Sequence, residues 1–112
     1  MVNSRQKGKR GERYFKDILR SIFPNIQRNW NGQTYKGGVD FLFTEPFDFE
    51  AKTGVAYKSK RNRAILTQLE NEGKPSNYKV ALIKPDREFP YVLMSLSDFM
   101  EILQVLKREG AL

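Results

Sequence analysis

The sequence contains no cysteine and no histidine. Without cysteine the chain has neither disulfide bridges nor a thiolate nucleophile, and without histidine it has neither a Ser-His-Asp triad nor the common zinc sites. Any bound metal ion must therefore be held by oxygen ligands. Such ligands favour magnesium, manganese or calcium over zinc, copper or iron.

Long apolar runs are also missing. The sequence has no stretch of about 18 apolar residues that could span a membrane, and its first residues are polar and basic, unlike a signal peptide. We therefore expect a soluble cytoplasmic protein, from a bacterial, archaeal or phage-infected host cell, with no membrane partner. At 112 residues the chain has room for one core, so we predict a single domain over residues 1–112 with a basic arm over about residues 1–10.

Acidic residues are the minority among the charged residues. Twenty Lys and Arg stand against 13 Asp and Glu, a net charge of +7 that is typical of proteins that bind a polyanion. The excess gathers near the N-terminus and around residue 60. Either cluster alone is also explained as solvated surface, but together they favour contacts to nucleic-acid phosphates, which release counterions. The candidate contacts are Arg5, Lys7, Lys9, Arg10, Arg13, Lys58, Lys60, Arg61 and Arg63.

Three segments have the apolar spacing of helices. The first is predicted from near Gly11 to near Phe23, and Pro24 ends it. The second is predicted over Asn62–Glu72. The third begins with Ser97 as its N-cap, and its apolar residues cover more than half of its circumference. We therefore expect the third helix to be covered on two sides.

Alternating and continuous apolar runs predict five strands in one sheet. They cover residues 26–30, 39–43, 47–51, 78–84 and 91–95. The fourth is apolar enough to lie at the centre of the sheet. The predicted order is helix, strand, strand, strand, helix, strand, strand, helix, which is an α/β fold with a central mixed sheet flanked by helices.

The turn between the second and third predicted strands decides how their charged residues meet. A three-residue turn over Thr44–Pro46 would pair the phenylalanines of both strands on the buried face. In the same register Asp40 lies opposite Glu50, and Lys52 projects beside Glu50. A two-residue turn would instead place Ala51 opposite Asp40 and separate the charged residues.

Glu12 is expected on the edge of the first helix that faces the sheet. Carboxylates that converge from this helix and the two strands repel one another unless a cation neutralises them, so the set is a metal-site hypothesis. Taken singly, each residue has an ordinary explanation. Glu12 can pair with Lys16, Asp40 can be a polar residue at the start of a strand, and Glu50 with Lys52 can lie on a solvated strand face.

Two motifs add a family resemblance. The segments Gly37–Asp40 and Phe47–Lys52 resemble the Asp…Glu-x-Lys core of PD-(D/E)xK nucleases. Asp48–Lys52 is similar to the same stretch of RecU-type Holliday junction resolvases, and Lys9–Arg13 is similar to the start of the first helix in RecU-type and archaeal Hjc-type resolvases. The likeness follows the element order over nearly the whole chain. RecU-type enzymes also carry a stalk-like insertion that this chain has no room for.

The resemblance implies a restriction-endonuclease-like fold and specific residue roles. It implies Glu12, Asp40, Glu50 and the backbone carbonyl of Ala51 as metal ligands, Lys52 as the catalytic lysine and Gln68 as a supporting polar residue of the catalytic set. The implied metal is Mg²⁺, with Mn²⁺ as a substitute, and no small-molecule cofactor is implied.

The implied activity is structure-selective DNA cleavage that resolves four-way (Holliday) junctions by paired phosphodiester hydrolysis. Paired cuts need two active sites, which implies a homodimer on branched double-stranded DNA, with the C-terminal helix or the strand over 91–95 as its contact. Two alternatives remain open. One is another PD-(D/E)xK nuclease with a repair, nicking or restriction-like activity, and the other is a non-catalytic nucleic-acid-binding module.

Overall fold

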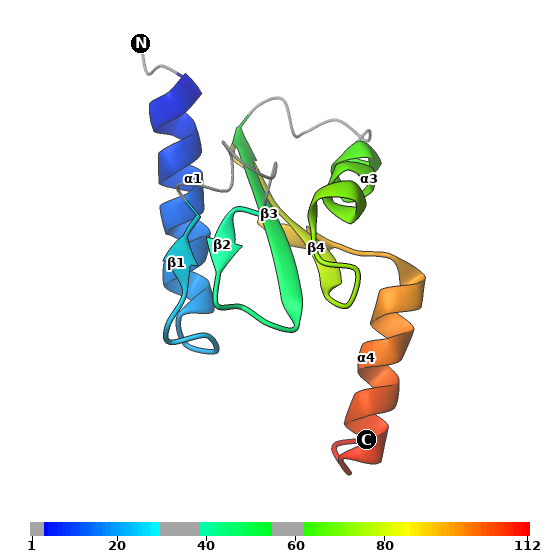
Figure 1. Ribbon diagram of the computed structural model, residues 1–112. Helices are drawn as coiled ribbons and strands as arrows, with labels where there is room; N and C mark the ends of the chain where they lie inside the picture. Colours follow the sequence, from blue (N-terminus) through cyan, green and yellow to red (C-terminus); the bar gives the residue numbers. More distant parts are fainter. Residues whose placement is uncertain (1–3, 30–38, 55–61) are drawn as a thin grey trace.

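The computed structural model describes residues 4–29, 39–54 and 62–112, with side chains from residue 9 onward. Within these ranges the element order is the predicted one: helix, three strands, helix, two strands, helix (Figure 1). The elements are α1 (Ser4–Leu19), β1 (Gln27–Arg28), β2 (Phe41–Leu42), β3 (Phe47–Gly54), α3 (Arg63–Glu72), β4 (Tyr78–Pro85), β5 (Tyr91–Leu93) and α4 (Leu96–Arg108).

In the described ranges the strands form two sheets, not the single sheet that was predicted. The larger sheet has the order β3-β4-β5, with β4 parallel to β3 and antiparallel to β5. The smaller sheet pairs β1 with β2 in antiparallel fashion. The prediction that the fourth strand is central is confirmed, and its segment Val80–Ile83 is buried.

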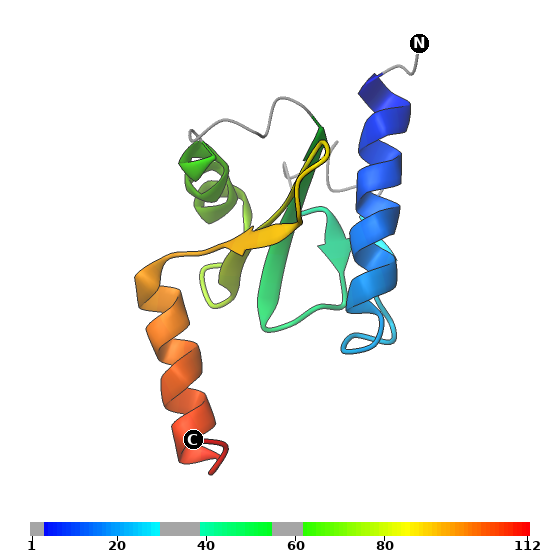
Figure 2. The same cartoon turned by 180° about the vertical axis from the view of Figure 1, so that it is seen from behind.

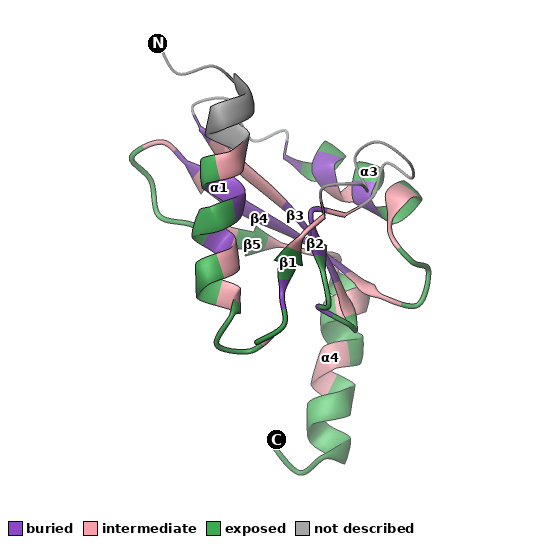
Figure 3. Ribbon diagram, turned by 60° about the vertical axis from the view of Figure 1, so that its left-hand side comes forward, coloured by how far each residue is buried: buried purple, intermediate pink, exposed green. Residues whose placement is uncertain are grey.

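The two helices α1 and α3 cover opposite faces of the larger sheet (Figure 3). Phe15 of α1 packs in one core with Phe49, Val80 and Leu82. Ile65 of α3 packs in a second core with Ala81 and Ile83. This division follows from strand geometry, because successive side chains of β4 point to opposite faces.

Helix α1 begins at Ser4 instead of near Gly11, so the segment predicted as a basic arm is helical from residue 4. The segment contains Arg, Lys and Gln, which are good helix formers that a search for apolar spacing does not detect. The helix also ends at Leu19, earlier than predicted. The backbone N–H of Phe23 donates to the carbonyl of Leu19 (2.8 Å), so the chain turns back at this point.

The predicted hairpin between the second and third strands is wrong. Within the described ranges β2 pairs with β1, through Gln27 with Leu42 and Arg28 with Phe41. Phe43 is exposed and has a φ of 65°, so it does not lie across from a phenylalanine of β3. Thr44 closes the turn instead, since its Oγ1 donates to the carbonyl of Phe47 (2.8 Å).

Helix α4 projects away from the sheet, as both sides of the molecule show (Figures 1 and 2). None of its residues is buried, so the expected cover on two sides is absent from the described part of the chain. Its N-cap is Ser95, whose Oγ accepts from the backbone N–H of Asp98 (3.1 Å), and not Ser97 as predicted. Among the described residues no helix has both the length and the apolar character that a membrane span requires.

Candidate active site

The edge of β3 that faces away from β4 binds Asp40. The backbone N–H of Asp40 donates to the carbonyl of Phe49 (3.2 Å), and Oδ2 of Asp40 accepts from the backbone N–H of Ala51 (2.8 Å). These two bonds hold Asp40 beside the residues on either side of Glu50. The predicted proximity of Asp40 and Glu50 is therefore present, although the hairpin that was expected to produce it is not.

Asp40 and Glu50 are both buried, with 6% and 7% of their surface exposed. Burial is the main cause that raises the pKa of Asp40 to about 7, and the nearby Glu50 carboxylate raises it further, against the opposing effect of the Ala51 N–H. Burial also raises the pKa of Glu50 above its ordinary value, although Lys52 opposes this change. Two carboxyl groups in such surroundings favour a bound proton or a bound cation.

Lys52 is the cationic side chain closest in sequence to this pair. Its Nζ lies 3.3 Å from Oε1 of Glu50, and 28% of its side chain is exposed. Both side chains leave β3 on the face covered by α3, because they alternate with Phe49 of the other core. Lys52 can therefore reach the edge of the site from the solvent side. We call Asp40, Glu50 and Lys52 the β3 edge site.

Helix α1 approaches the end of β3 closely at Gly11. A Cβ atom on Gly11 would lie 2.6 Å from Oγ1 of Thr53, so only glycine fits there. This contact brings the buried Glu12 near the β3 edge site, where its charge adds to the rise in the pKa of Asp40 and of Glu50. The Glu12 carboxylate itself accepts from Nε of Arg28 (2.6 Å), a residue of β1.

Gln68 is linked to the β3 edge site through Glu72, a residue that the sequence analysis missed. Its Nε2 donates to Oε1 of Glu72 (3.0 Å), one turn later on α3. The charge of Glu72 contributes to the raised pKa of Glu50. The four-residue spacing places Gln68 and Glu72 on the same face of the helix, and this spacing was the available signal.

The donor set fits a hard divalent cation in its chemistry. Asp40 and Glu50 supply carboxylate oxygens, and the backbone of Ala51 faces the same edge, since its N–H binds Asp40. The described residues contain no group of three or more carboxylates placed to hold a metal ion. Of the predicted carboxylate ligands, Glu12 is paired with Arg28. Asp40 and Glu50 are the two that lie together at the edge of β3.

The predicted phosphate contacts are described only in part. Arg10 and Arg13 are exposed on α1, Lys9 is half-buried and Arg63 is exposed at the start of α3. The N-terminal end of α1 and the C-terminal end of β3 lie at the same end of the molecule (Figure 1). Arg5 and Lys7 belong to α1, but their side chains are not described, and Lys58, Lys60 and Arg61 lie outside the described residues.

Comparison with known proteins finds no protein-family model, no curated protein and no solved structure that matches this chain. The resemblance to PD-(D/E)xK nucleases thus remains a prediction from the motifs in the sequence.

Proposed function

We propose that this protein is a magnesium-dependent, structure-selective DNA endonuclease with a restriction-endonuclease-like fold, and that it resolves four-way (Holliday) junctions. The observation that carries the proposal is the β3 edge site. Two buried carboxyl groups with raised pKa values meet there, and a lysine lies 3.3 Å from one of them. A divalent cation would neutralise this pair and allow both groups to remain ionised.

Each residue of the site has a role in this proposal. Asp40, Glu50 and the carbonyl of Ala51 would hold Mg²⁺, or Mn²⁺ in its place, and Glu12 would join them once its pair with Arg28 opens. The bound ion would supply Lewis acidity at the phosphoryl group and a water of lowered pKa. Lys52 would position that water and offset negative charge in the transition state. Gln68 would orient the carboxylate of Glu72 at the rim of the site.

The basic surface supports a substrate that is recognised by its backbone. Arg10 and Arg13 are exposed on α1, and Arg63 is exposed at the start of α3. Phosphate contacts position a nucleic acid without reading its bases, so branched DNA can be selected by shape. A DNA substrate would place the activity in the cytoplasm of a bacterial, archaeal or phage-infected cell.

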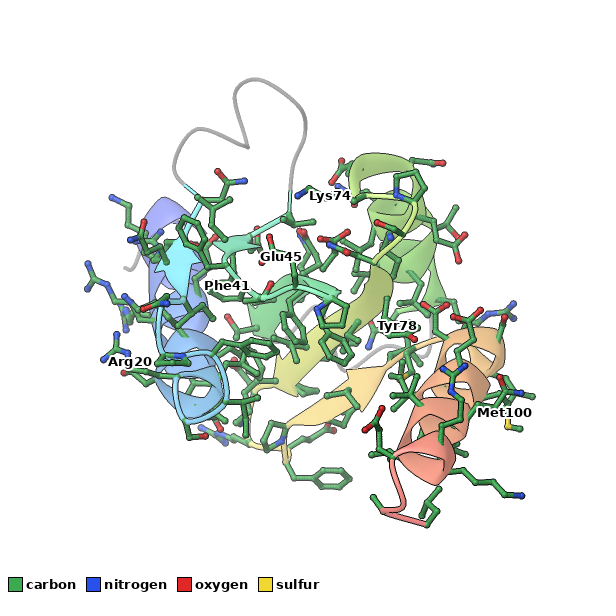
Figure 4. All side chains as sticks on the ribbon, turned by 60° about the horizontal axis from the view of Figure 1, so that its bottom comes forward. Arg20, Phe41, Glu45, Lys74, Tyr78 and Met100 are labelled. Carbon is green, nitrogen blue, oxygen red and sulfur yellow. The ribbon has the colours of Figure 1, made fainter. Side chains whose placement is uncertain are left out.

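Paired cuts require a second active site, and α4 offers a surface for a second copy of the chain. Phe99 and Met100 are exposed on α4, and Met100 points away from the sheet (Figure 4). Two antiparallel copies of α4 would cover exposed apolar residues of both helices.

Size-exclusion chromatography with light scattering, which measures the molar mass of the protein in solution, tests this contact. We expect the mass of a dimer for the wild type and of a monomer for Phe99→Asp. Phe89→Asp, at an exposed phenylalanine outside α4, is the matched control and should remain dimeric. A wild-type monomer would contradict the proposed contact.

Cleavage of labelled DNA tests the proposed function itself. Purified protein is incubated with a four-way junction and with a linear duplex of the same sequence, in magnesium and in chelator. We expect paired cuts near the branch point, in magnesium only. Equal cutting of the linear duplex would indicate another nuclease activity of the same site. Tight binding without any cutting would indicate a non-catalytic nucleic-acid-binding module.

A further inference from the structure

Three basic residues lie along one side of α1, and one of them, Arg13, is also a predicted phosphate contact. Arg13 and Lys16 belong to α1, and Arg20 directly follows it, with its backbone N–H donating to the carbonyl of Lys16 (3.0 Å). The spacing of three and four residues therefore places them on one face. Arg13 and Arg20 are exposed, and Lys16 is half-buried. Within the described ranges no acidic side chain pairs with any of the three. Arg20 lies on the side of α1 that faces away from α3 and α4 (Figure 4).

A groove runs beside this basic row, between α1 and the segment that leads into β1. Its first part is lined by Arg13, Lys16, Ile26, Gln27 and Arg28. Its second part is lined by Arg20, Pro24, Asn25, Ile26, Gln27 and Phe43. Ile26 and Gln27 line both parts, so the two lie next to each other. We call this surface the α1 groove.

The α1 groove has the features of a binding site for phosphate groups. Arg13 and Lys16 lie on α1, Arg20 directly follows it, and Gln27 adds an amide that can donate to an anion. Arg28 at the end of the groove is held in place by Glu12 (2.6 Å). No carboxylate is among the residues that line either part. The surface therefore attracts anions along its whole described length.

We propose that the α1 groove binds the phosphate backbone of a nucleic-acid duplex arm, in addition to the contacts near the start of α1. This inference rests on the proposed function and deepens it. Arg13 and Arg20 are seven residues apart, and at the helical rise of about 1.5 Å per residue the row is about 10 Å long. A row of this length can reach more than one phosphate of a DNA strand.

The test measures DNA binding by the full-length protein in the absence of magnesium. The variant Lys16→Gln with Arg20→Gln removes two cations of the groove. Lys74→Gln with Arg87→Gln removes the same charge from exposed residues outside α1 and α4 and is the matched control. Affinity for a fluorescent duplex is measured by anisotropy over a series of salt concentrations, after circular dichroism has shown that each variant is folded.

Loss of two phosphate contacts should reduce the slope of log affinity against log salt by about 2, while the control keeps the wild-type slope. A groove variant with the wild-type slope would overturn the inference. The outcome is separate from that of the proposed function. If the slope changes but the protein never cuts DNA, the proposed nuclease function is wrong and the proposed binding by the α1 groove is supported. If the protein cuts DNA and the slope is unchanged, the nuclease function is supported and the groove proposal is wrong.

Discussion

Two buried carboxylates lie two residues apart on β3, and the protein treats them differently. Asp48 is surrounded by donors: its Oδ2 accepts from the backbone N–H of Lys74 (2.7 Å), its Oδ1 accepts from Nδ2 of Asn77 (3.0 Å), and Nζ of Lys79 lies 3.4 Å from Oδ2. Glu50 has Lys52 at 3.3 Å but also feels the negative charges of its neighbours. One carboxylate is surrounded by donors, and the other lies near further carboxyl groups that raise its pKa.

The surroundings of Asp48 explain why it is structural. Nζ of Lys79 also donates to the carbonyls of Lys74 and Asn77, so this ion pair ties the turn between α3 and β4 to β3. Gly73 leaves no space for a side chain against Asp48. A carboxylate that stabilises the fold is thus enclosed by its own donors. At the β3 edge site, in contrast, the charge of Glu50 raises the pKa of Asp40, and Lys52 is the cation that pairs with Glu50.

The largest expected effect is on cleavage. Glu50→Gln keeps the shape of the side chain but removes a charge that the proposed cation needs, so the single-turnover rate of junction cutting should fall by about 10³-fold. DNA binding should be retained, and the free energy of unfolding should stay the same or rise because the repulsion with Asp40 is relieved. An active Glu50→Gln enzyme would place the chemistry elsewhere.

The opposite behaviour is expected at Asp48. Asp48→Ala leaves the buried Lys79 without its counterion, and removing one partner of a buried pair typically costs about 3–5 kcal/mol of stability. Urea unfolding measures this loss. Adding Lys79→Met to Asp48→Ala should recover much of it. A loss below about 1 kcal/mol for Asp48→Ala would mean that the two carboxylates do not differ as described.

The pH dependence of stability tests the raised pKa of Asp40 in the metal-free protein. The pKa of Asp40 is about 7 in the fold and 3.8 without it, so the folded state binds the proton more tightly. Stability is therefore greatest at low pH with respect to this group and is lost, by a few kcal/mol, as the pH rises from about 4 through about 7. Asp40→Asn should remove this part of the pH profile. Thermal unfolding in chelator, repeated across this pH range, provides the measurement.

A smaller effect is expected at Gln68. Gln68→Ala removes the hydrogen bond to Glu72 at the rim of the β3 edge site, and loss of such an outer contact typically costs about 10-fold or somewhat more in metal affinity or activity. The magnesium concentration that gives half-maximal cutting should therefore rise. Thr67→Ala, an exposed neighbour on α3, is the control. Equal effects of both substitutions would assign Gln68 no role beyond the helix surface.

The element order and several bounds could be predicted because the apolar spacing of an element is clearest where that element packs against a core. The predicted helix over Asn62–Glu72 and the predicted strand over 78–84 lie within one residue of α3 and β4. Ile65 and the Val80–Ile83 segment carry that pattern and are buried.

The strand pairing could not be predicted from local pattern. A hairpin between 39–43 and 47–51 satisfied the alternation of phenylalanines, but β2 pairs with β1, which is remote in sequence. The exposed position of Phe43 follows from its positive φ, which no spacing rule indicates. The apolar pattern of α4 was visible in the sequence, but it could not show that the described part of the chain leaves this helix uncovered.

The β3 edge site was predicted because Glu50 and Lys52 are two residues apart on one strand and Asp40 directly precedes the strand before it in the sequence, β2. Its wider surroundings were not, since Arg28 reaches Glu12 from β1 and Glu72 acts on Glu50 from α3. Both are contacts between elements that only the folded chain brings together.

Titration calorimetry with Mg²⁺ and Mn²⁺ at pH 8 tests the central claim, that Asp40 and Glu50 hold a divalent cation. We expect the wild type to bind the ion, Glu50→Gln and Asp40→Asn to lose most of that binding, and the Asp48→Ala Lys79→Met variant to keep it. Absence of binding to the wild type, or equal binding by wild type and Glu50→Gln, would contradict the account.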